Sequence, residues 1–186
     1  MVARKHALVV RLAATGLAAV LSINAEAGNH EKRKPSSGVE PNAWPRVGIP
    51  DPVARRASRE ALDQARRLLG EPRCRNVLAQ FADREGHPLA DRLDALGVDV
   101  QTYLTMIEFN DGTRHRSCGE GVIAFTRPGS RVVYLCIDAL KRTWQQKPTH
   151  VVAVFIHEML HTLGLGENPP PTQDITRRVL QQCSEE

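Results

Sequence analysis

The chain has 186 residues and a formal charge of +4 at pH 7. This excess is small, and its lysines and arginines are not interleaved with aromatic residues, which make up only 4% of the chain. Composition therefore gives no reason to expect a nucleic-acid partner.

Residues 1–27 are predicted to be a signal peptide. Arg4, Lys5 and Arg11 precede a short apolar segment, and Ala25-Glu26-Ala27 has the small-x-small form of a cleavage site. The mature chain would begin at residue 28, in a secreted or periplasmic location. A membrane anchor is the alternative, but the apolar run is short for a span of about 20 residues. We therefore expect no stable membrane span after removal of the signal.

Residues 28–52 are predicted to be a proline-rich linker, a pro-segment or an arm that wraps the domain. Composition alone gives this stretch no packed core. Its prolines are Pro35, Pro41, Pro45, Pro50 and Pro52. Residues 53–186 would then form the folded domain.

The first part of that domain is predicted to be helical. Apolar residues recur at helical spacing from residue 53, and Gly70 with Pro72 ends the run. A short helix over residues 75–82 and a helical turn over residues 91–96 follow. None of these segments carries obvious chemistry, so core packing accounts for them best.

The middle of the chain is predicted to form strands. Residues 100–109 alternate, and Asn110-Asp111-Gly112 is a turn signal. Residues 122–125 and 132–137 flank Pro128-Gly129 in the manner of a hairpin. We therefore expect an α+β fold with a small, mainly antiparallel sheet of three or four strands.

Four cysteines follow the predicted signal peptide, namely Cys74, Cys118, Cys136 and Cys183. Export and an even count favour two disulfides, for which three connectivities exist. Cys118 and Cys136 flank the predicted hairpin, which favours that bridge and leaves Cys74 for Cys183. A cysteine-rich zinc site is the alternative, but none of its usual Cys-x-x-Cys spacings is present.

A helix is predicted from residue 148 to residue 163, with Thr149 as its N-cap and Gly164 as its left-handed end. It carries His-Glu-Met-Leu-His, which places His157 and His161 on one side, where both can bind one ion. Glu158, about 100° around the helix from His157, can hold a water molecule beside that ion. A chance match is the competing interpretation.

The stretch His-Glu-Met-Leu-His-Thr-Leu-Gly-Leu-Gly-Glu (157–167) resembles the metzincin branch of the zincin metallopeptidases, whose pattern is HExxHxxGxx followed by a third ligand. The resemblance implies that His157, His161 and Glu167 bind zinc, that Glu158 is the general base, and that Gly164 turns the chain back to the metal. It also implies a zincin-like fold, in which the sheet covers the active-site helix and its edge strand pairs with extended substrate.

Two features depart from the family pattern. The third ligand of metzincins is usually His and sometimes Asp, whereas this chain has Glu167. No methionine follows Glu167, so the methionine turn is missing. His, His and Glu together nevertheless form an ordinary zinc set in other metallopeptidases.

Further residues are candidates for the site. Asp174, early in a last helix predicted to end near residue 182, is the second choice for the third ligand. The chain between Glu167 and that helix is predicted to be a stiff, extended bridge over residues 168–171. The sequence does not separate four candidates for an additional hydrogen-bond donor, namely Tyr103, Tyr134, His115 and His150.

These features predict an exported zinc metalloendopeptidase, a hydrolase acting on a peptide or protein substrate through a metal-activated water, with Glu158 as general base. A catalytically inactive zinc-binding or scaffold module with the same fold is the main alternative. A third interpretation has no metal, with the histidines as polar residues near the core. Cleavage specificity, latency and oligomeric state are open at this point.

Overall fold

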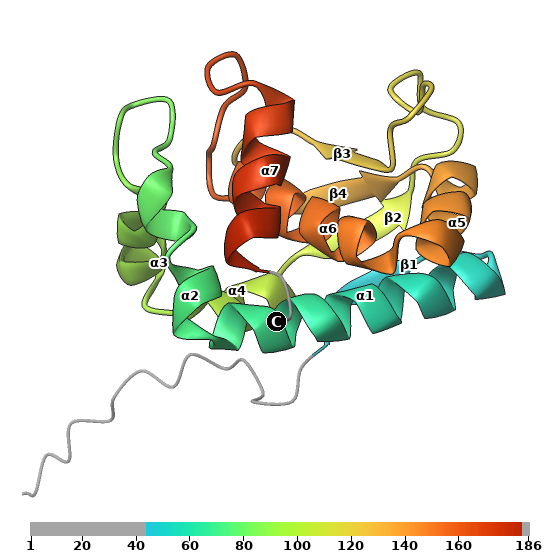
Figure 1. Ribbon diagram of the computed structural model, residues 1–186, viewed down its shortest axis with the longest axis horizontal. Coiled ribbons are helices and arrows are strands. Elements are labelled where there is room, and N and C mark those ends of the chain that lie inside the picture. The colour runs from blue at the N-terminus through green and yellow to red at the C-terminus, as the bar shows by residue number, and fades with distance from the viewer. Residues whose placement is uncertain (1–43, 184–186) are drawn as a thin grey trace, which may run out of the picture. The chain divides into compact units, whose positions relative to one another are not determined.

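The computed structural model describes residues 44–183, so the predicted signal peptide and most of the predicted linker lie outside the described residues (Figure 1). The elements in chain order are β1 (Arg46–Gly48), α1 (Pro52–Gly70), α2 (Pro72–Arg75), the 3-10 helix η1 (Leu78–Gln80), α3 (Leu89–Leu96), α4 (Val100–Thr105), β2 (Glu108–Asp111), β3 (Ala124–Thr126), β4 (Val132–Leu135), α5 (Ile137–Gln146), α6 (Pro148–Thr162) and α7 (Thr172–Gln182). The α+β class is confirmed.

The sheet is mixed, which makes the prediction of a mainly antiparallel sheet wrong. Its four strands lie in the order β1-β2-β4-β3. β2 is parallel to both β1 and β4, and only β3 and β4 are antiparallel. β1 and β2 are parallel because a long, mainly helical connection returns the chain to the same end of the sheet, and β2 and β4 are parallel because the antiparallel strand β3 lies between them in the chain. Strand composition does not reveal these directions.

The strand β1 lies inside the segment predicted to be a linker or arm. It pairs with β2 in the register Val47↔Phe109, and the next residue, Ile49, is buried. Prolines at either side of so short an edge strand are tolerated, because their missing N–H groups interrupt no ladder. Asp51 then accepts the N–H of Ala54 and caps α1. The packed domain therefore includes residues before 53.

The prediction of a strand over residues 100–105 is wrong, because this stretch is the helix α4. Asp99 accepts the N–H of Thr102 at 2.8 Å as an N-cap, and the buried side chains of Val100, Tyr103 and Leu104 have helical spacing. The strand β2 begins only at Glu108 and includes Asn110 and Asp111, so the turn starts two residues later than predicted.

The predicted β3–β4 hairpin is present, with Phe125 opposite Tyr134 and Gly129 at φ 81° in its turn. The helix expected over residues 75–82 is replaced by α2 and η1, and α5, which follows β4, was not predicted. The predicted first and last helices correspond to α1 and α7.

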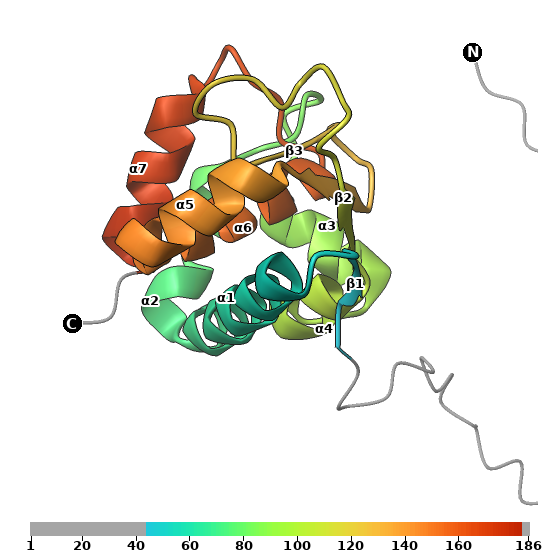
Figure 2. The same ribbon diagram turned by 90° about the vertical axis from the view of Figure 1, so that its right-hand side faces the viewer.

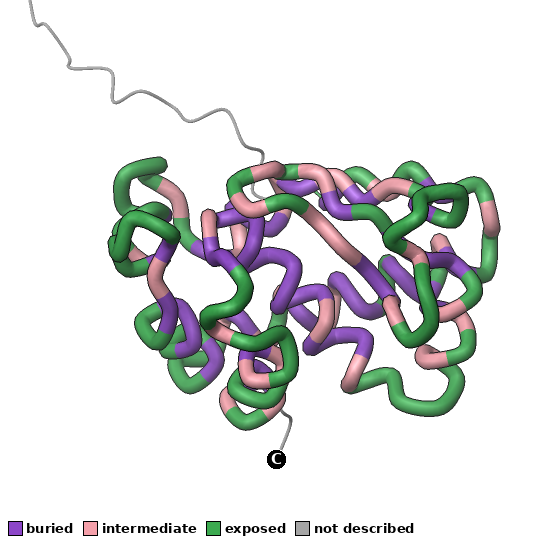
Figure 3. The backbone as a smooth tube through the Cα atoms, turned by 90° about the horizontal axis from the view of Figure 1, so that it is seen from above, coloured by how far each residue is buried: buried purple, intermediate pink, exposed green. Residues whose placement is uncertain are grey.

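The helix α6 lies at the centre of the domain and contacts α1, α5, α7 and β3 (Figure 2). Its apolar side is buried, and Phe155 stacks on Phe109 of β2 with ring centroids 5.4 Å apart. Figure 3 shows buried segments gathered in the interior and exposed ones around the rim. The helix begins at Pro148, so Lys147 holds the N-cap position and the prediction for Thr149 is wrong.

Two disulfides join the cysteines in the pairing favoured from the sequence. Cys74 of α2 bonds to Cys183 at the end of α7, and Cys118 bonds to Cys136 at the start of α5. Among residues 44–183, none of the helices combines the length and the apolar character that a membrane span requires.

Candidate metal centre

The helix α6 and the turn that follows it bring His157, His161 and Glu167 together. The Nε2 atoms of the two histidines lie 2.8 Å apart. Oε1 of Glu167 lies 3.2 Å from Nε2 of His161 and 3.7 Å from Nε2 of His157. The histidines are 3% and 4% exposed, while the Glu167 side chain is 39% exposed. The three side chains thus converge from the protein interior toward one partly open point.

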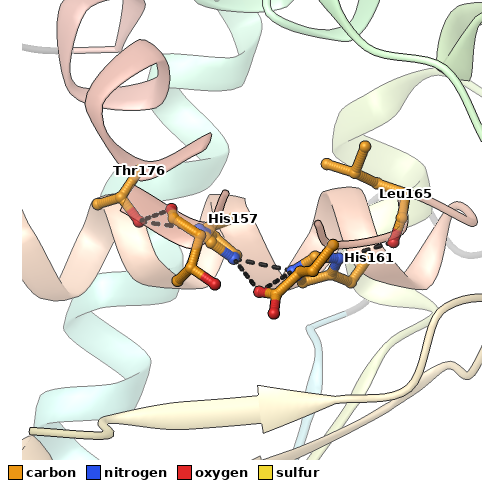
Figure 4. A network of polar contacts seen from close by, with 6 residues as sticks. His157, His161, Leu165 and Thr176 are labelled. Atoms are coloured by element: carbon orange, nitrogen blue, oxygen red, sulfur yellow. Dashed lines mark hydrogen bonds and ion pairs between the residues drawn. The ribbon is translucent and has the colours of Figure 1, made fainter. Parts of the chain in front are cut away.

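The backbone fixes the tautomer of His161. Its Nδ1 lies 2.7 Å from the carbonyl oxygen of Leu165 (Figure 4). A carbonyl oxygen can only accept a hydrogen bond, so Nδ1 carries the proton. In the neutral imidazole, Nε2 then has a free lone pair, as a metal ligand requires.

A threonine of α7 does the same for His157. Nδ1 of His157 lies 2.9 Å from the hydroxyl of Thr176, and that hydroxyl donates its own hydrogen to the carbonyl of Thr172. The Thr176 oxygen therefore accepts from Nδ1, and Nε2 of His157 is also left with a lone pair. Sequence reasoning missed Thr176, because only the packing of α7 on α6 places it there.

These contacts test whether a metal ion fits the residues present. Two imidazole lone pairs and a carboxylate oxygen face one another, and none of the three groups offers a proton to the others. Burial first, and then the neighbouring His161, lower the pKa of His157 to about 4, although Glu167 opposes the shift. Ligand atoms about 2.0–2.1 Å from a tetrahedral zinc lie about 3.3 Å from one another. The separations of 2.8, 3.2 and 3.7 Å bracket this value, so the donor set fits zinc.

Glu167 is held as an anion. Burial alone would raise its pKa, but the Thr172 hydroxyl and the two histidines together keep that pKa below its ordinary value. An ionised carboxylate at this point supplies the negative charge that a dication needs. Through Thr172 and Thr176, α7 thus supports two of the three candidate ligands, Glu167 and His157.

Glu158 is a buried carboxyl group beside this cluster. It is only 5% exposed, and its Oε2 has no hydrogen-bond partner among the described residues. Burial first, and then the charge of Glu167, raise the pKa of Glu158 to about 8, while the facing backbone amide of Thr126 acts in the opposite direction. A carboxyl group whose pKa is raised toward neutrality can both accept and release a proton near neutral pH.

The turn after α6 depends on Gly164. This residue has φ 112°, a backbone conformation that residues with a side chain rarely adopt. Its N–H donates to the carbonyl of His161. A Cβ at this position would lie 3.2 Å from Cβ of Asp83, which forms a β-bridge with Leu165. The predicted role of Gly164 in turning the chain back is consistent with this geometry.

The segment after Glu167 is not the predicted extended bridge. The Asn168–Pro169 and Pro169–Pro170 peptide bonds are cis, and the N–H of Asn168 donates to the carbonyl of Pro170. The chain therefore turns tightly before α7 begins at Thr172.

Most of the secondary candidates lie elsewhere. Asp174 pairs with Arg177 at 2.6 Å and does not join the ligand cluster. Tyr103 is buried and donates to Thr162, Tyr134 stacks on Phe125, and His115 packs against Phe125 in a tilted arrangement. Of the four candidate donors only His150 lines the cleft.

The cluster opens into a cleft of about 790 Å³. Its walls come from α6, from α7, from β3 with its flanking loops, and from Arg84. A volume of this size is typical of small-ligand and substrate sites.

Comparisons of the chain with models of protein families, with curated proteins and with solved structures found no match. The resemblance to metzincins thus rests on residues 157–167 alone.

We expect Thr176→Val to weaken zinc binding about 10- to 100-fold, because His157 loses the group that fixes its tautomer and ring orientation. Thr176→Ser, which keeps the hydroxyl, should bind zinc nearly as the parent does. Competition against a chromophoric chelator measures both affinities. Equal affinity in the valine variant would show that Thr176 does not support the site.

Proposed function

We propose that this chain is an exported zinc metalloendopeptidase that hydrolyses peptide bonds through an activated water molecule. The observation that carries the proposal is the convergence of three acceptor atoms, from His157, His161 and Glu167, beside a buried carboxyl group whose Oε2 is unpartnered. All four side chains line one cleft.

His157, His161 and Glu167 would hold the zinc ion. A zinc ion held by three protein ligands polarises a substrate carbonyl and lowers the pKa of a water molecule. Glu158 would accept a proton from the attacking water at Oε2 as the water oxygen bonds to the carbonyl carbon. It would then pass this proton to the nitrogen as the C–N bond breaks.

The outer edge of β3 pairs with no other strand of the described chain, which supports binding of an extended peptide there. Cys136 donates to the carbonyl of Ile123, so alternate residues of the strand face β4. The backbone groups of Ala124 and Thr126 therefore point away from β4, and the amide of Thr126 faces Glu158. A substrate strand added at this edge would pass over the candidate metal centre.

The proposed location is secreted or periplasmic. Disulfides persist in oxidising compartments, and the two bridges in the structure are compatible with such a place.

The test is to measure the zinc content of the chain from Gly28 onward and to profile its cleavage of a diverse peptide library. We expect about one zinc per chain, and cleavage that is lost with a chelator and restored by zinc. Zinc without cleavage of any peptide would favour the inactive scaffold module. If the chain bound no zinc, both the metallopeptidase and the zinc-binding scaffold module would be excluded.

A further inference from the structure

The cleft has two chemically different ends. Along α6, Val154 lies one turn before His157, whereas Gly166 and Glu167 follow the end of the helix. The strand β3 runs in the same direction, because Thr126 faces Glu158 and Gly129, farther along, donates to the carbonyl of His161. Residues just before β3 therefore lie beside the first half of α6.

The helix α7 runs in the opposite direction. Its first residue, Thr172, lies by Glu167, and Thr176 contacts His157, so Leu180 continues toward the start of α6. Leu180 and Val154 therefore line the cleft at the same end as Val122. Three aliphatic side chains from three separate segments line this end, together with the imidazole of His150 at the start of α6.

Arg84 lies at the other end. It belongs to a tight turn in which the N–H groups of Glu85 and His87 both donate to Asp83, and Asp83 pairs with Leu165. The side chain of Arg84 lies against Gly166, where an added Cβ would be 3.3 Å from both Cγ and Nε of the arginine. The fixed turn after Asp83 and the lack of a side chain at Gly166 thus allow this guanidinium to lie beside the candidate metal centre.

Within residues 44–183, no group pairs with the charge of Arg84. Among the described residues its guanidinium has no hydrogen bond or ion pair, and it does not contribute to the lowered pKa of Glu167. Arg177, which lines the same cleft, is paired with Asp174. Burial, and then Lys147, lower the pKa of His150, so this histidine is neutral at pH 7. Arg84 is therefore the unpaired cation of the cleft wall in residues 44–183.

We propose that Arg84 binds a carboxylate group of the substrate, while the end formed by Val122, Val154 and Leu180 receives an apolar side chain. Val154 and His161 are about 10 Å apart along the helix, which is the length of about three extended residues. The substrate class is thus a peptide with an apolar and an anionic group on opposite sides of the cleaved bond. This inference rests on the proposed function.

The carboxylate has two possible sources, an acidic side chain or a C-terminus, and peptide direction separates them. A peptide antiparallel to β3 would place an acidic residue at Arg84 and a later apolar residue at the apolar end. A peptide parallel to β3 would reverse this order and could bring its C-terminus to Arg84. Short capped peptides in both orders, each with Glu or Gln, and one leucine peptide with a free or an amidated C-terminus, cover both sources.

The experiment measures binding of these peptides to the zinc-loaded Glu158→Gln variant by titration calorimetry, so that its readout does not depend on turnover. We expect one acid peptide to bind about tenfold more tightly than its amide counterpart, as a charge-assisted contact would give. Arg84→Gln should remove this preference, and Arg84→Lys should retain most of it. Arg177→Gln, the matched control, should leave it unchanged.

A preference that persists in Arg84→Gln, or no preference in any pair, would overturn the inference, as would failure of every peptide to bind. The proposed function is judged separately, by cleavage with the unaltered chain. Cleavage without preference for acid would leave the function standing and refute the role of Arg84. Binding that depends on the peptide carboxylate, without cleavage, would support the role of Arg84 and refute the proposed peptidase activity.

Discussion

Replacing Glu158 by glutamine is expected to leave zinc binding intact and to slow peptide hydrolysis by about 10²- to 10⁴-fold. Glutamine has the same shape, and its oxygen can still face the amide of Thr126. It cannot accept the proton of an attacking water molecule, so the loss should appear in kcat. Zinc analysis and single-turnover cleavage of one library substrate measure the two properties.

Asp174→Asn is the control for this variant. Asp174 is also a carboxylate of this region, but it pairs with Arg177 outside the ligand cluster. Its replacement should change kcat little. If Glu158→Gln retained full activity with zinc bound, Glu158 would not be the base, whereas a loss of zinc would show that it supports the metal.

Removing the Cys74–Cys183 disulfide is expected to have the largest effect on stability. The bridge spans 109 residues, and the chain-entropy relation gives about 5 kcal/mol for a loop of this length. It also ties the end of α7, the helix whose Thr176 holds His157. The double variant Cys74→Ser/Cys183→Ser should therefore unfold at a lower urea concentration and bind zinc more weakly.

The double variant Cys118→Ser/Cys136→Ser provides the comparison. Its bridge spans 18 residues, for which the same relation gives about 3 kcal/mol, and it lies away from α7. It should lose less stability and keep its zinc affinity. If the Cys118→Ser/Cys136→Ser variant instead unfolded at the lower urea concentration, α7 would stay in place without its disulfide.

The parts of the fold that sequence predicts well are those encoded over a few neighbouring residues. Glycine and proline end α1, and Pro128-Gly129 marks the β3–β4 turn. The candidate ligands could also be chosen from the sequence, because His157 and His161 share one side of a helix. Glu167 follows only six residues after His161, beyond a turn that Gly164 permits.

The errors arise where local patterns are ambiguous. Val100 and Leu104 are four residues apart, a spacing that suits both a strand face and a helix face. The cap at Asp99 resolves this stretch as α4. The three residues of β1 are too few to show any period, and their partner β2 lies about 60 residues away.

The supporting residues of the site could not be predicted for a different reason. Thr176 contacts His157 from 19 residues later in the chain, whereas Asp83, which forms a β-bridge with Leu165, comes well before α6 in the chain. Neither residue forms part of a recognisable spacing. Their roles follow from tertiary packing of α7 and of the turn after η1 against α6.

The place of β1 in the sheet determines how far the chain can be shortened from its N-terminal side. Arg46–Gly48 supplies an edge strand, and Asp51 both caps α1 and binds Lys141 of α5 at 2.9 Å. A truncation that removed Arg46–Gly48 would therefore take an edge strand from the sheet. A truncation that also removed Asp51 would leave α1 without its cap and Lys141 without this partner.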